Sequence, residues 1–121
     1  MNEHTLGAME LRFAELIWAH APITSGELVR LCAAAFGWKK STTYTMLRRL
    51  CQRGLFQNDG GTVSACMSEA EFRAMQCEQF VSDAFDGSLP QFVAAFTSRR
   101  PLRADEVEEL KQMIADCEVR T

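Results

Sequence analysis

The chain has 121 residues and a formal net charge of -3, a size that allows one domain or two very small ones and excludes a large enzyme scaffold. Its 47% hydrophobic and 24% charged residues are typical of a folded protein, not of a disordered or fibrous one. The longest apolar run, Leu31 to Phe36, is too short to span a membrane, and Met1 to Thr5 do not begin a secretory signal. We therefore expect a cytoplasmic protein without a membrane partner.

The charges are distributed unevenly along the chain. Residues 1–66 hold seven Lys and Arg against five Asp and Glu (7 − 5 = +2), whereas residues 67–121 hold six against eleven (6 − 11 = -5). Between Leu28 and Asn58 every charged residue is basic. A local basic surface of this kind favours a nucleic-acid partner despite the acidic total.

The first part of the chain reads as three short helices. An apolar stripe with helical spacing predicts a helix from Ala8 to His20, before Pro22. Thr24 begins a second helix that ends at Gly37. Ser41 is the expected N-cap of a third helix, which Gly54 closes. Its inner face is predicted to consist of Thr43, Met46, Leu47, Leu50 and Cys51.

A β-hairpin is expected directly after the third helix. The segments 55–58 and 62–66 read as strands, and Asp59-Gly60-Gly61 supplies the positive φ angles of a tight turn. Three helices followed by a hairpin are the order of a winged helix-turn-helix. The sequence therefore predicts a mainly α protein with a winged-helix DNA-binding domain over residues 1–67.

Residues 68–121 are predicted to form a helical dimerisation domain of three helices. Ser68 and Ser88 are expected to cap the first two, and Pro101 precedes the third. This region holds five of the eight phenylalanines and is too small to bury them alone, so we expect it to interlock with a second chain as a homodimer. The predicted dimerisation residues are Phe72, Phe80, Val81, Phe85, Leu89, Phe92, Val93, Phe96, Val107, Leu110 and Ile114.

The outer face of the third helix combines hydroxyl groups with basic side chains. Arginine pairs with guanine edges and with phosphates, and threonine contacts thymine or phosphate, so this helix is the expected recognition helix. The predicted DNA-binding residues are Lys39, Lys40, Ser41, Thr42, Tyr44, Thr45, Arg48, Arg49 and Arg53. Of these, the lysines and arginines are expected to anchor phosphates, and the others to lie at or near base edges.

Catalytic and cofactor sites have no visible counterpart in the sequence. The two histidines, His4 and His20, are not arranged with an acid and a nucleophile, and Gly60-Gly61 fits a hairpin turn, not a phosphate loop. The cysteines lack any CxxC pair, which favours reduced thiols over a disulfide framework or a zinc site. They are Cys32, Cys51, Cys66, Cys77 and Cys117. We expect no enzyme activity, no cofactor and no metal.

Several stretches together resemble the penicillinase repressor (BlaI/MecI) family of bacterial transcription regulators. They are the run from Leu6 to Trp18, Gly37-Trp38, the run from Ser41 to Leu50, Arg53-Gly54-Leu55, Phe85-Asp86-Gly87-Ser88 and the run from Leu102 to Lys111. The resemblance spans nearly the whole chain. It implies a homodimeric repressor whose winged helix reads a palindromic double-stranded operator and whose C-terminal helices dimerise.

The resemblance also has limits. In the beta-lactamase branch a membrane sensor protease signals release, and the repressor is cut at an Asn-Phe bond, where this chain has Ala95-Phe96. A sensor protease is therefore implied as an upstream partner by the family alone. The copper-responsive branch carries paired C-terminal cysteines, of which this chain keeps only Cys117.

The wing is shorter than is usual in the family and carries Asp59 and no base at its tip, so we expect it to add little phosphate affinity. Two alternatives remain at this point. One is a winged-helix module that binds protein instead of DNA, and the other is a regulator whose cysteines respond to thiol oxidation or metal.

Overall fold

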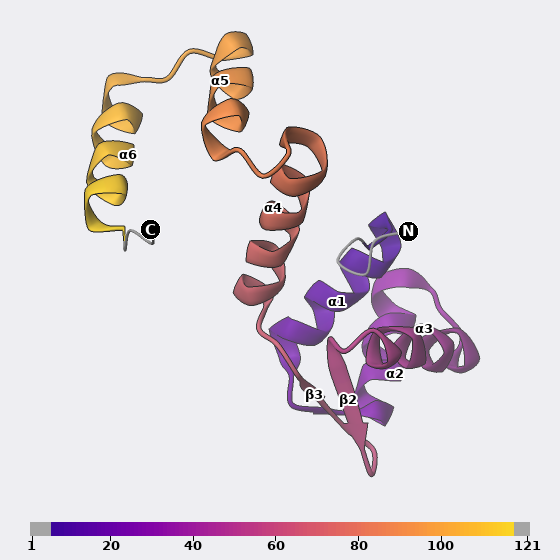
Figure 1. Ribbon diagram of the computed structural model, residues 1–121. Coiled ribbons are helices and arrows are strands. Elements are labelled where there is room, and N and C mark those ends of the chain that lie inside the picture. Colours follow the sequence, from indigo (N-terminus) through magenta and orange to yellow (C-terminus); the bar gives the residue numbers. More distant parts are fainter. Residues whose placement is uncertain (1–5, 118–121) are drawn as a thin grey trace. The chain divides into compact units, whose positions relative to one another are not determined.

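The computed structural model describes residues 6–117, which form six helices and a three-stranded antiparallel sheet (Figure 1). No helix among these residues has both the length and the apolar character needed to cross a membrane. The chain divides into two compact units between Gln79 and Phe80. Each unit is described by itself below.

Three helices make up most of the first unit. They are α1 (Ala8–His20), α2 (Ser25–Phe36) and α3 (Lys40–Gln52). The Thr24 hydroxyl caps α2 by accepting a hydrogen bond from the backbone N–H of Glu27, and Gly37 ends the helix with a φ of 68°. The predicted ends of α1 and α2 are thus confirmed, because local capping chemistry determines them.

The predicted start of α3 is wrong by a small margin. The N-cap is Lys39, whose carbonyl accepts from the backbone N–H of Thr43, and Ser41 lies inside the first turn. The reason is the anchoring of Trp38, whose ring packs against Phe13 at 5.3 Å and Phe36 at 4.8 Å between centroids. No side chain caps the helix, because the ammonium group of Lys39 cannot accept a hydrogen bond.

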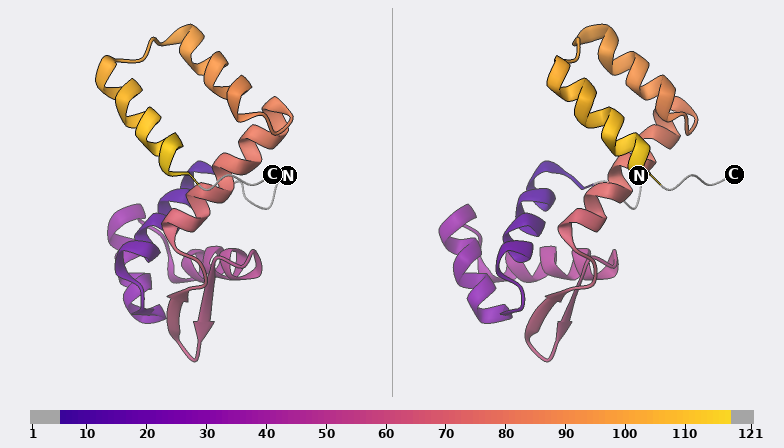
Figure 2. Two further views of the ribbon diagram at one scale, coloured as in Figure 1. Left: turned by 60° about the vertical axis from the view of Figure 1, so that its left-hand side comes forward. Right: turned by 90° about the vertical axis from the view of Figure 1, so that its left-hand side faces the viewer.

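The wing is the hairpin of β2 (Phe56–Asp59) and β3 (Thr62–Ala65), joined by two glycines with φ angles of 60° and 95°. A third strand, β1 (Ile23–Thr24), pairs with β3 and makes β3 the central strand. β1 has no counterpart among the predicted elements, because two residues are too few to show an alternating pattern. In both views of Figure 2 the hairpin extends beyond the helices of its own unit.

The core of the first unit closes with the beginning of α4 (Glu69–Phe85). Ser68 and Glu71 cap this helix reciprocally, as predicted. Phe72 is only 1% exposed and lies 5.6 Å from the ring of Trp18, whose indole N–H donates to the carbonyl of Met67. The fully buried core consists of Phe13, Ala14, Ile17, Leu28, Cys32, Leu47, Leu50, Leu55, Phe56, Val63 and Phe72.

The burial of Phe72 corrects its assignment to the dimerisation set. Its side chain fills the winged-helix core and is not available to a second chain. It also explains why the first unit extends to Gln79, later than the boundary after residue 67 expected from the sequence. Met67 in the linker after the wing packs against this core, and the helix that follows begins as part of the first unit.

The second unit contains the end of α4, α5 (Leu89–Arg99) and α6 (Ala104–Asp116). Asp86 and Gly87, both with positive φ, separate α4 from α5, and the Ser88 hydroxyl caps α5 as predicted. Three phenylalanine rings, Phe80, Phe85 and Phe92, meet edge to face with centroids 5.7 to 6.0 Å apart. None of the described residues of this unit is fully buried.

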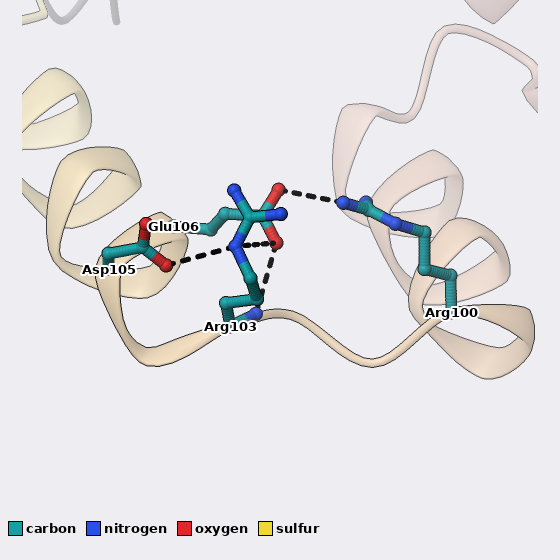
Figure 3. A network of polar contacts seen from close by, with 4 residues as sticks. All are labelled: Arg100, Arg103, Asp105 and Glu106. Atoms are coloured by element: carbon teal, nitrogen blue, oxygen red, sulfur yellow. Dashed lines mark hydrogen bonds and ion pairs between the residues drawn. The ribbon is translucent and has the colours of Figure 1, made fainter.

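Polar contacts organise the turn between α5 and α6 (Figure 3). The Glu106 carboxylate accepts from the backbone N–H of Arg103 and from the guanidinium of Arg100, each at 3.0 Å. Arg103 also pairs with Asp105 at 3.1 Å. These bonds lower the pKa of Glu106, first through the backbone hydrogen bond of Arg103 and then through Arg100. The acids at the start of α6 therefore have a local structural role, and their negative charge also suits the N-terminal end of the helix dipole.

Candidate nucleic-acid interface

The outer face of α3 is polar, basic and open to solvent. Thr43, Leu47 and Leu50 turn inward and are buried, whereas Met46 and Cys51 of the predicted inner face are only half-buried. The exposed residues are Lys39, Lys40, Ser41, Thr42, Thr45, Arg48 and Arg49. We call this set the α3 surface.

The basic groups of the α3 surface have no acidic partner. Lys39, Lys40, Arg48 and Arg49 form no ion pair with any residue that the structure describes. Elsewhere in the described chain only Arg12 and Arg99 share this condition, and the remaining lysines and arginines are paired with carboxylates. The α3 surface is thus a concentration of positive charge that the fold itself does not neutralise.

Arg53 lies apart from this surface. Its side chain is 22% exposed, and its guanidinium is 3.5 Å from the Glu10 carboxylate of α1. The structure therefore does not bring Arg53 together with the other basic residues of the predicted set. The ion pair between Arg53 and Glu10 could not be predicted from sequence spacing, because the two residues are 43 positions apart.

Tyr44 has an internal partner as well. Its hydroxyl donates to the Ser25 hydroxyl at 3.1 Å, and the ammonium group of Lys40 lies 6.0 Å from the centre of its ring. The Thr45 hydroxyl donates to the carbonyl of Ser41, which leaves Thr45 exposed with its hydroxyl bonded within the helix. Ser25 was not among the predicted site residues, since only the tertiary structure brings the start of α2 to α3.

The wing presents neutral and acidic groups beside α3. Gln57, Asn58, Asp59 and Thr62 are exposed, and no Lys or Arg occurs between Arg53 and Arg73. A shallow hollow of about 190 Å³ separates the wing from α3, lined by Tyr44, Leu47, Arg48, Cys51 and Asn58. Arg48 therefore lies at the junction between helix and wing.

The cysteines and His20 do not gather into a cluster in the part of the chain that the structure describes. Burial raises the pKa of the Cys32 thiol, and burial together with the nearby Cys66 raises that of Cys51. Within residues 6–117 no three His, Cys, Asp or Glu side chains come together as a metal site. The ring nitrogen Nδ1 of His20 lies 2.9 Å from the carbonyl of Leu16, and His4 is outside the described residues.

The second unit carries an exposed apolar surface. A groove of about 350 Å³ between α5 and α6 is lined mostly by apolar side chains, among them Phe92, Phe96 and Leu110. Val81, Phe85, Phe92 and Val107 of the predicted dimerisation set are half-buried within the unit. Six others are exposed: Phe80, Leu89, Val93, Phe96, Leu110 and Ile114.

Comparisons with known proteins agree over nearly the whole chain. The family model of the penicillinase repressor matches residues 6–116. The penicillinase repressor of Bacillus licheniformis is 26% identical over 111 residues, which cover 88% of this chain and 87% of that protein. The methicillin resistance regulatory protein MecI of Staphylococcus aureus is 19% identical over 115 residues, covering 92% and 94% respectively.

A solved structure is also similar to part of the chain. It is the solution structure of the Bacillus licheniformis BlaI monomeric form in complex with the blaP half-operator. It shares 24% identity, covers 55% of this chain and 87% of that chain, and has a TM-score of 0.48.

Proposed function

Because the chain belongs to the penicillinase repressor family, we propose that it represses transcription by binding a palindromic DNA operator as a homodimer. The observation that carries this proposal is the α3 surface, whose basic side chains are neutralised by no carboxylate of the described chain. Charges left unpaired on one exposed helix attract a polyanion. An α-helix with this composition also has the width to enter the major groove.

The residues of the α3 surface divide by chemistry. We assign phosphate contacts to Lys39, Lys40 and Arg49. Their ammonium and guanidinium groups can bind the DNA backbone without reading the base sequence. Ser41, Thr42 and Thr45 are assigned to base edges or adjacent phosphates, since they are short, exposed and polar. Arg48, beside the wing, is the candidate for a bidentate contact with guanine.

The exposed apolar residues of the second unit support the proposed dimer. Leu89 is 59% exposed and Ile114 is 70% exposed, which leaves apolar area in water that a second copy of the same surface would cover. A two-fold homodimer presents two copies of α3 related by the same axis. Its DNA site is then palindromic, with half-sites spaced by the separation of the two helices.

The test is a selection of genomic fragments, followed by titration of the best fragment over a series of salt concentrations. Arg48→Ala should weaken specific binding by about 1–3 kcal/mol if Arg48 reads a base, or reduce the salt slope by about one unit if it contacts only phosphate. Arg99→Ala is the matched control, since Arg99 is an exposed, unpaired arginine of α5. The control should bind like the parent.

Two outcomes would contradict the proposal. Unchanged affinity of Arg48→Ala at every salt concentration would mean that α3 is not the reading face. Weak binding of the parent to all fragments alike, with a Kd no better than about 10⁻⁴ to 10⁻⁶ M at physiological salt, would instead indicate a module that binds a protein partner.

A further inference from the structure

We propose that Tyr44 is a positioning residue for operator binding, which holds α3 at a fixed rotation against the start of α2 and the turn of the wing. This inference rests on the proposed function. It assigns to Tyr44 a role inside the protein, in place of the contact with DNA expected from its position on the helix.

A continuous series of hydrogen bonds joins the three elements. The Tyr44 hydroxyl of α3 donates to the Ser25 hydroxyl, at the first residue of α2, at 3.1 Å. The backbone N–H of Ser25 donates to the carbonyl of Gly61 in the wing turn at 2.8 Å. The N–H of Gly61 in turn donates to the side-chain oxygen of Asn58 on β2 at 3.1 Å.

The bond to Ser25 adds a directional restraint beside the buried face of α3, where most contacts are apolar. Leu47 and Leu50 lie with Thr43 along one buried stripe of the helix, and their apolar contacts tolerate small rotations because they are not directional. A hydrogen bond weakens steeply away from its preferred geometry. Tyr44 follows Thr43 by one residue, about 100° around the helix, so its bond lies to the side of the stripe, where it opposes rotation.

Rotation of α3 would displace the groups that meet DNA. Arg48 is one turn beyond Tyr44 on the same side of the helix, and both residues line the hollow next to the wing. Lys40 is one turn before Tyr44, with its ammonium group over the ring. Tyr44 is thus central to a column of basic side chains whose direction depends on the rotation of the helix.

The internal contact can be tested without DNA. Tyr44 is the single tyrosine of the chain, so 3-fluorotyrosine incorporated throughout the protein gives one ¹⁹F resonance in NMR spectra. Ser25→Ala should shift this resonance, because it removes the acceptor of the hydroxyl. Ser82→Ala, at an exposed serine of α4, is the control and should leave it unchanged. An identical resonance in the Ser25→Ala protein would overturn the contact.

The positioning role is tested by a double-mutant cycle on operator affinity. Tyr44→Phe removes only the hydroxyl and keeps the ring beneath Lys40. Tyr44→Phe and Ser25→Ala should each weaken binding by about threefold to tenfold, and the double variant should be no weaker than either one. The salt slope should stay that of the parent, because every basic group is retained.

The cycle separates this inference from the proposed function. Losses that multiply in the double variant, or a loss in Tyr44→Phe that Ser25→Ala does not reproduce, would mean that the hydroxyl contacts DNA itself and would overturn the positioning role. A parent protein that selects no fragment contradicts the proposed function. The parent and Arg48→Ala, measured alongside, distinguish these cases.

Discussion

The two compact units use phenylalanine in opposite ways. In the first unit, Phe13, Phe56 and Phe72 are at most 1% exposed and fill a closed core. In the second, Phe80 is 55% exposed and Phe96 is 45% exposed, although the rings of that unit contact one another. The winged helix thus buries its large apolar residues within one chain, whereas the second unit leaves much of its apolar surface exposed, as an interface does before it is covered.

The largest effect should come from a cavity in the closed core. Phe13→Ala should lower the free energy of unfolding by about 3–5 kcal/mol, because it removes a fully buried ring. Phe80→Ala is the control for the comparison and should cost much less in a monomer, since more than half of Phe80 is already in water. Urea unfolding followed by circular dichroism at low protein concentration measures both. Equal losses would remove the distinction between the units.

The proposed dimer can be broken with a charge on the second unit. Ile114→Glu should raise the dimer dissociation constant by about 100-fold or more, because a carboxylate would be buried without a partner. Ala115→Glu adds the same charge at an exposed neighbour on α6 and should change it much less. Sedimentation velocity over a range of concentrations measures the change. A parent that stays monomeric at micromolar concentration would contradict the dimer altogether.

Thiol reactivity should sharpen the same contrast. Cys32 is buried in the core of the first unit and its pKa is raised by that burial, so less thiolate is present at a given pH and labelling is slow. Cys117 of the second unit is exposed and should react with a thiol reagent within the folded protein. Mass spectrometry of the labelled peptides, taken over time at dilution, gives the order. Early labelling of Cys32 would mean that the core opens readily.

The smallest effect should be a pH dependence in the second unit. The folded-state pKa of Glu106 is lowered, chiefly by the backbone N–H of Arg103, so its contribution to order is present above the unfolded pKa and is lost as pH falls through the folded pKa. Glu106→Gln should remove that acid-side change in the helicity of α5 and α6. Glu108→Gln is the control, because the Glu108 carboxylate pairs only with Lys111 among the residues that the structure describes. An unchanged acid transition in Glu106→Gln would contradict the role of this carboxylate.

Local sequence patterns were sufficient for most of the elements and for the exposed, basic face of α3. Thr24, Ser68 and Ser88 cap helices where predicted, and two glycines make the turn of the wing, because capping and turn geometry involve only a few neighbouring residues. The exposed basic face of α3 followed from helical periodicity, which separates inner from outer residues without knowledge of the fold.

The sequence does not show which of the predicted residues contact other side chains of the same chain, because these contacts depend on tertiary packing. Phe72 joins the core of the first unit, Arg53 pairs with Glu10, and Tyr44 bonds to Ser25. Each of these contacts joins positions that are 19 or more residues apart in the sequence. Periodicity shows which side of a helix faces inward, whereas the identity of the opposing side chain depends on how the elements pack.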